Sequence, residues 1–186
     1  MKSWKLVAAA LLSLLLLGCG SAAAQSRFGV IGGLTFANAP KAAELDYKTP
    51  TLYHAGVTYQ YHVAGGFSIQ PSVLFNMRGV NNGDGSVAMR LGAVEVPVAL
   101  QWGPDLLAFR PFIQVVPFIG GTVYSPDKSL DFKKLEGGIG IGGGIEIWKF
   151  QISAHYSWNL NPYANKNESG LLWAFRSTMV SLALLF

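Results

Sequence analysis

The stretch Tyr53-His-Ala-Gly-Val-Thr-Tyr-Gln-Tyr-His-Val63 alternates apolar residues with polar or small ones from end to end. A β-strand turns successive side chains to opposite faces, so residues two apart share a face. One face of this stretch therefore carries Tyr53, Ala55, Val57, Tyr59, Tyr61 and Val63. The other face carries two histidines, a glycine, a threonine and a glutamine. The pattern predicts a strand that separates an apolar environment from a polar one.

The same period of two divides the chain into eight predicted strands. Besides 53–63, the clear segments are 67–78, 93–102 and 149–159, and the weaker ones are about 27–36, 109–123, 133–147 and 173–186. Transmembrane strands need only about 9–11 residues of alternating apolarity, and bacterial single-chain barrels have an even number of them. The sequence therefore predicts an all-β fold, a closed eight-stranded antiparallel transmembrane β-barrel.

The last predicted strand ends in Met179-Val-Ser-Leu-Ala-Leu-Leu-Phe186, with Val180, Leu182, Leu184 and Phe186 on one face. In a soluble protein, such a strand would leave an apolar, unpaired edge in water. In a bilayer, pairing with the first strand of a closed barrel leaves no edge.

Connections between the predicted strands alternate strictly in length. The short ones are 64–66, 103–108 and 148–149, and the long, polar ones are 37–50, 79–88, 124–132 and 161–172. Outer-membrane barrels have short periplasmic turns and longer extracellular loops. Aromatic residues near the predicted strand ends, such as Trp102, Trp148 and Trp158, suit the membrane–water boundary. We therefore expect an outer-membrane barrel with both termini in the periplasm.

Four prolines, at positions 71, 97, 111 and 117, lie inside predicted strands. A closed barrel pairs both edges of every strand, and proline has no N–H for the ladder. We expect these prolines to mark bulges or bends.

The first 24 residues resemble a cleaved signal peptide. Lys2 and Lys5 precede the apolar stretch 6–17, which is too short to span a membrane as a helix. Cleavage after Ala24 leaves 25–186 as a single barrel domain. The alternative is acylation of Cys19, because Leu16-Leu-Gly-Cys19 resembles the lipobox of bacterial lipoproteins.

Six pieces of the chain resemble, in order, the small PorT-like outer-membrane β-barrel proteins common in Bacteroidetes. They are Phe28–Phe36, Phe67–Gly79, Val94–Leu100, Arg110–Gly120, Gly138–Glu146 and His155–Ser157. The resemblance implies an eight-stranded barrel in the outer membrane. One founding member of that family is linked to protein secretion, but most members have no assigned activity.

Charged residues fall on the polar face of the predicted strands. They include Arg78, Glu95, Arg110, Glu136 and Glu146. Glu95 lies on the strand between those of Arg78 and Arg110, where carboxylate and guanidinium can satisfy each other. An eight-stranded barrel is only wide enough for its own side chains, so we expect a structural ion-pair network in the lumen. A proton or ion path is the alternative.

Two motifs carry catalytic or cofactor alternatives. His155-Tyr-Ser157 resembles the His-x-Ser motif of the outer-membrane lipid A deacylases, with Glu168 downstream as the acid. The alternation places His155 and Ser157 in the lumen, away from lipid, which argues against that enzyme.

Gly138-Ile-Gly-Ile-Gly-Gly143 matches a dinucleotide motif but precedes a strand rather than a helix. We expect these glycines to make room for bulky charged side chains opposite.

We expect neither a cofactor nor a metal, because three histidines, and a cysteine lost with the signal peptide, are too few for a metal cluster. Without Lys2 and Lys5, 12 of the 14 basic residues remain against 10 acidic ones, and this surplus of positive charge is too small to indicate binding of nucleic acid.

The sequence thus predicts a non-enzymatic outer-membrane barrel, surrounded by lipid and sufficient as a monomer. A structural, accessory or interaction role would use its loops, where a protein partner could bind. The alternatives are a lipid A ester hydrolase and a soluble or lipid-anchored periplasmic barrel around an apolar ligand.

Overall fold

The computed structural model describes residues 26–38, 50–63, 65–81, 87–106, 108–124, 135–160, 163–164, 172–173 and 176–186. The predicted signal peptide, Cys19, Glu168 and most of the predicted long loops lie outside these residues. Within the described part of the chain, no helix is both long and apolar enough to cross a membrane.

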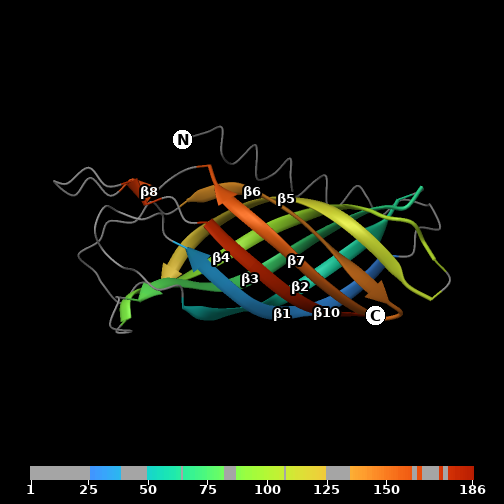
Figure 1. Cartoon of the computed structure of the whole chain (residues 1–186), viewed down its shortest axis with the longest axis horizontal. Coiled ribbons are helices and arrows are strands. Elements are labelled where there is room, and N and C mark those ends of the chain that lie inside the picture. Colours follow the sequence, from blue (N-terminus) through green and yellow to red (C-terminus); the bar gives the residue numbers. More distant parts are fainter. Residues whose placement is uncertain are drawn as a thin grey trace.

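Eight strands close into one antiparallel barrel (Figure 1). They are β1 (Ser26–Asn38), β2 (Thr51–His62), β3 (Phe67–Asn81), β4 (Val87–Trp102), β5 (Arg110–Tyr124), β6 (Glu136–Ile147), β7 (Phe150–Asn159) and β10 (Arg176–Leu185). The strands pair in chain order, and β1 closes the barrel by pairing with β10, from Gly29 opposite Leu185 to Asn38 opposite Arg176. The short strands β8 (Tyr163–Ala164) and β9 (Leu172–Trp173) form a separate two-stranded sheet. The predicted fold is confirmed.

Some predicted strand boundaries are wrong. β3 continues to Asn81 and β4 begins at Val87, so that part of the predicted loop 79–88 is strand. The last barrel strand begins at Arg176 rather than at 173, because Trp173 belongs to β9. Alternating apolarity reports contact with lipid, so the signal fades where a paired strand continues beyond the bilayer.

The two ends of the barrel differ. One end, which we call the turn end, holds the short connections 63–66, 103–109 and 148–149, the start of β1 and the end of β10. The opposite end, called the loop end, holds the ends of β1, β3, β5 and β7 and the starts of β2, β4, β6 and β10. In outer-membrane barrels the turn end faces the periplasm and the loop end faces outward.

The barrel is apolar outside and polar inside, as the alternation predicts. Val73 and Ile152 on the exterior are 49% and 52% exposed, whereas Glu95 and Gln151 in the interior are 3% and 2% exposed. Exposed aromatic side chains surround the turn end: Phe28, Phe67, Trp102, Phe109, Trp148, Phe150 and Phe186. An apolar outer band with aromatic residues at its edge is the surface that a transmembrane barrel presents to lipid.

The expectation that the prolines mark bulges is wrong. The register shifts lie between Val80 and Asn81 and between Gly92 and Ala93. At Pro71 the register is kept, but the β3–β4 pairing passes from Pro71 opposite Val98 directly to Leu74 opposite Glu95. A bulge needs an extra residue on one strand, whereas a proline only removes a donor from the ladder.

Candidate functional site

The loop-end half of the lumen holds a buried cluster around one arginine. Arg78 on β3 pairs with Glu95 on β4 at 2.6 Å and with Glu136 on β6 at 2.7 Å. Asn76 Nδ2 donates to Glu95 at 2.9 Å, and Asn159 Nδ2 donates to Glu136 at 2.8 Å. These donors surround both carboxylates, which burial would otherwise destabilise strongly. We call Arg78, Glu95 and Glu136, with the two asparagines, the loop-end cluster.

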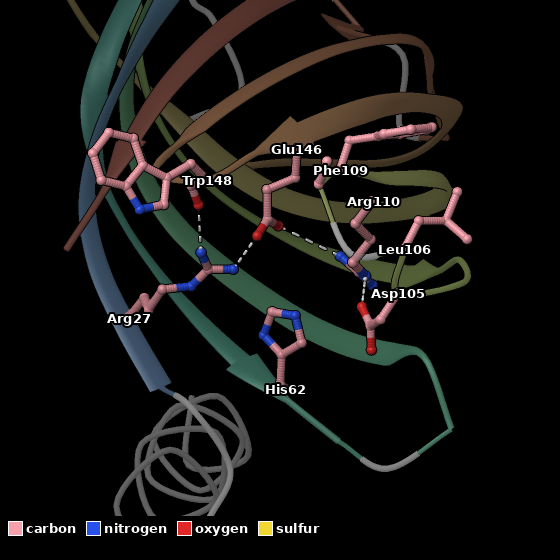
Figure 2. A pocket seen from close by; sticks show the side chains of 9 residues that line it. Arg27, His62, Asp105, Leu106, Phe109, Arg110, Glu146 and Trp148 are labelled. Atoms are coloured by element: carbon pink, nitrogen blue, oxygen red, sulfur yellow. Dashed lines mark hydrogen bonds and ion pairs between the residues drawn. The ribbon is translucent and has the colours of Figure 1, made fainter.

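A second cluster lies at the turn end and centres on Glu146 of β6 (Figure 2). Its carboxylate forms ion pairs with Arg27 of β1 and with Arg110 of β5, the latter at 3.6 Å, and accepts from Gln60 Nε2 at 3.0 Å. Arg110 also contacts Asp105 of the β4–β5 connection, Nε to Oδ1, at 3.2 Å. We call Arg27, Arg110, Glu146 and Asp105 the turn-end cluster.

The lumen network is thus divided differently from the sequence-based expectation. Glu95 pairs with Arg78 alone of the two arginines, because it lies opposite Gly120 in the loop-end half of β5, far along that strand from Arg110. Arg27 and Asp105 also belong to this network, although neither was predicted from the sequence. Arg27 shares the inward parity of Gly29 and Thr35 on β1, and that signal could have identified it.

Polar side chains continue inward from each cluster. From the turn end, Gln60 donates to Gln101 at 3.3 Å and Gln101 to Gln70 at 2.7 Å. From the loop end, Asn76 accepts from Thr35 at 2.9 Å, and His54 lies 3.0 Å from the Thr35 hydroxyl. The apolar side chains Leu74, Val116 and Met179, each 3% exposed, also fill the interior. Side chains from all eight barrel strands therefore occupy the lumen, as expected at this strand number.

Two inward glycines of β6, Gly138 and Gly144, make room for phenylalanine rings, whereas Gly140 and Gly142 face His155 on β7. An added Cβ at Gly138 would lie 2.5 Å from the Phe118 ring, and one at Gly144 would lie 2.7 Å from Phe112 Cζ. The guanidinium carbons of Arg78 and Arg110 lie 5.8 Å and 5.6 Å from the centroids of Phe118 and Phe112, respectively. For Gly138 in the predicted motif, and for Gly144 just after it, the expectation that charged side chains fill the space directly is wrong: rings fill it, and the guanidinium groups lie over the rings.

The His-x-Ser motif faces the interior. Ser157 is 3% exposed, and its Oγ lies 2.8 Å from the Ser177 Oγ and donates to the Ser177 carbonyl at 3.2 Å. Its hydroxyl is thus engaged by β10 rather than by His155. Glu168, the proposed acid, lies outside the described residues. Within the described residues, the serine of this motif therefore faces the lumen rather than lipid.

A pocket of about 650 Å³ opens beside the turn-end cluster. The pocket lies between the last residues of β2, the last residues of β6 and the β4–β5 connection. Figure 2 shows that His62, at the end of β2, points toward the cluster. Trp148, in the two-residue turn after β6, has a φ of 58°, a conformation suited to tight hairpin turns. Its carbonyl accepts from Arg27 Nη1 at 3.0 Å.

Comparison with known proteins supports the membrane placement of the barrel. A family model described as "Outer membrane protein beta-barrel domain" matches residues 21–165. The structure is similar to Neisserial surface protein A, with a TM-score of 0.55 at 12% identity, covering 85% of this chain and 95% of that one. It is also similar to the outer membrane protein OprG of Pseudomonas aeruginosa, with a TM-score of 0.53 at 12% identity, covering 87% and 96%. At this identity the structures show the fold alone. No curated protein matches the sequence.

Proposed function

The chain belongs to the outer membrane protein beta-barrel domain family, and on that premise we propose that it acts without catalysis, in a structural or accessory role exerted through its extracellular loops. The protein is a small eight-stranded barrel of the bacterial outer membrane. The observation that carries the proposal is the filled lumen, in which two ion-pair clusters and apolar side chains occupy the interior. A filled lumen leaves the loops as the accessible part of the outer surface.

The first test is conductance. Purified barrel in a planar lipid bilayer should show no stable channel steps, because the lumen is packed with its own side chains. A wide porin measured in the same bilayer serves as the positive control. Regular unitary steps from the wild-type protein would instead support a pore function and would contradict a purely structural role.

The second test addresses the loops. The predicted long loops 37–50, 79–88, 124–132 and 161–172 are replaced one at a time by a short Gly/Ser linker in the full chain. The replaced residues are 39–50, 82–86, 125–132 and 161–171, so that the barrel strands stay intact. The variants should retain the anomalous gel mobility of an intact barrel when unboiled. They should fail to restore the phenotype of a deletion strain, whereas a variant with a substituted turn at 64–66 should restore it. Full restoration by every loop variant would refute a loop-based role.

The link to protein secretion is a finer proposal, which rests on the resemblance to PorT-like barrels. It predicts that a deletion strain secretes less protein into the medium while its periplasmic protein content rises. An unchanged secreted fraction would remove that link and leave the loop-based role intact.

Of the two alternatives, the soluble barrel is wrong, because its exterior would have to be polar and the described exterior is apolar. The lipid A hydrolase has no supporting geometry, since Ser157 lies inside the barrel. We expect Ser157→Ala to leave the mass spectrum of lipid A unchanged in cells that express the protein. If expression of the wild-type protein changed the mass of lipid A and expression of Ser157→Ala did not, the enzyme would be established instead.

A further inference from the structure

The turn-end pocket places a fixed cation against an exposed anion. The Arg110 side chain is 5% exposed, and its Nη2 donates to the Gly66 carbonyl at 3.0 Å, so the β2–β3 turn holds the guanidinium in place. Asp105, which contacts Arg110 Nε, is 64% exposed and belongs to a connection rather than to a strand. An ion pair with so exposed a partner contributes little to stability. A carboxylate from outside could therefore replace Asp105 on Arg110 at small cost.

Three buried nitrogens at this pocket lack a hydrogen-bond partner among the described residues. They are Arg27 Nε, Arg110 Nε and His62 Nδ1. The contact of Arg110 Nε with Asp105 is an ion pair without hydrogen-bond alignment. Buried polar groups in folded proteins are nearly always satisfied, so unsatisfied ones indicate a missing water, ion or ligand. A carboxylate offers two oxygens that can accept from several donors at once.

The charges of the pocket favour a monoanion. Arg27 and Arg110 face Glu146 and Asp105, so that the arginines and carboxylates balance. When a ligand carboxylate replaces Asp105 on Arg110, the exposed Asp105 carboxylate is left to solvent, and the buried part of the site keeps two cations and two anions. A dianion such as a phosphate monoester would add an uncompensated negative charge beside Glu146, which is costly in a partly buried site.

The rim of the pocket is apolar. Leu106, Phe109 and Trp148 line it and are all exposed. Figure 2 shows Phe109 and Leu106 on the Arg110 side and Trp148 on the Arg27 side. An apolar group attached to the carboxylate would have surface to contact on either side of the charged centre.

We propose that the turn-end pocket binds a monocarboxylate that carries an apolar group, with the ligand carboxylate taking the place of Asp105 on Arg110. The carboxylate belongs either to the carboxyl terminus of a periplasmic peptide or to a free carboxylic acid. The pocket lies at the periplasmic end by the usual orientation of such barrels. This site is separate from the loop-based role proposed above, and neither depends on the other.

The test is calorimetric titration of the full-length mature barrel in lipid nanodiscs. N-acetylphenylalanine should bind, and its amide, N-acetylphenylalanine amide, should not, because only the acid carries the carboxylate. Asp105→Asn removes the competing internal carboxylate and should tighten binding of the acid about fivefold, since an exposed ion pair contributes up to about that factor. Asp127→Asn, a matched charge change at a position that follows β5 in the sequence, should leave the affinity unchanged.

Additional ligands distinguish a peptide carboxyl terminus from a free carboxylic acid, and a second variant covers the case in which Arg110→Gln does not fold. N-acetylglycine should bind more weakly than N-acetylphenylalanine if the rim contacts the apolar group. Comparing a tetrapeptide that ends in phenylalanine with 3-phenylpropionate separates a peptide carboxyl terminus from a free acid. Arg110→Gln should abolish binding, and if that variant does not fold, Asp105→Asn alone decides. Equal binding of acid and amide, no binding of the acid to either wild type or Asp105→Asn, or equal affinities of Asp105→Asn and Asp127→Asn would overturn the proposal.

Discussion

Removing the arginine of the loop-end cluster tests the energetic role of the filled lumen. In Arg78→Met, Glu95 and Glu136 lose their common cation while both remain almost completely inside the barrel. Removing one partner of a buried ion pair costs about 3–5 kcal/mol, because the remaining charge stays buried without compensation. Here two carboxylates lose the partner, so we expect the upper part of that range, about 4–5 kcal/mol.

The triple variant Arg78→Met, Glu95→Gln and Glu136→Gln separates charge from packing. Neutral amides remove both uncompensated charges, and buried ion pairs can often be replaced by neutral residues at little net cost. We therefore expect the triple variant to be more stable than Arg78→Met, within about 2 kcal/mol of the wild type. The single variants would not add, as residues in one network rarely do.

The assay is reversible urea unfolding in lipid vesicles, followed by tryptophan fluorescence and by the mobility of unboiled protein on gels. Arg176→Met, at an exposed position at the start of β10, is the matched control and should change the unfolding free energy by no more than about 0.5 kcal/mol. The reasoning is refuted if Arg78→Met costs no more than Arg176→Met. It is equally refuted if the triple variant is less stable than Arg78→Met.

Two further predictions concern the barrel wall. Gly138→Ala should destabilise the barrel by about 1–3 kcal/mol through overpacking, because the added Cβ would clash with the Trp158 carbonyl oxygen and lie 2.5 Å from the Phe118 ring. Gly137→Ala should cost less, because its Cβ would lie 3.6 Å from the Phe118 carbonyl oxygen, in ordinary van der Waals contact; similar urea midpoints for the two would contradict the packing argument. Val73→Lys, near the middle of β3 on the lipid face, should cost about 2–4 kcal/mol, and Phe67→Lys, at the turn end of the same strand, about 0–1 kcal/mol. Equal costs at Val73 and Phe67 would show that the strand does not cross a bilayer in this register.

Alternation in the sequence predicts the strands and their faces because it reports a local fact, namely which side of each residue meets lipid. The exposed Val73 and the buried Glu95 follow from their own strands alone. The pairing of charges depends instead on how far each strand is staggered against its neighbour. That stagger places Glu95 opposite Gly120 and Arg110 opposite Glu146, and no single segment of sequence contains this information.

The roles of the prolines and glycines were also harder to predict for a physical reason. A proline in a strand changes the ladder, but only an extra residue shifts the register, and the pattern does not show where the extra residue lies. A glycine such as Gly144 indicates missing volume without indicating what fills it. In this barrel the filler is Phe112, which comes from the neighbouring strand and supports Arg110.

The distribution of charge inside the barrel restricts where a function can lie. The exterior of the barrel is apolar and faces lipid. Inside the barrel, Leu74 lies between Ser72 and Asn76 on the inward face of β3. Ser72 belongs to the hydrogen bonds of the turn-end half through Thr58, and Asn76 to those of the loop-end half through Glu95. An ion or proton crossing the barrel would have to disrupt both buried ion-pair clusters, which is costly. The two buried clusters therefore favour our proposal of recognition at the ends of the barrel over passage through it.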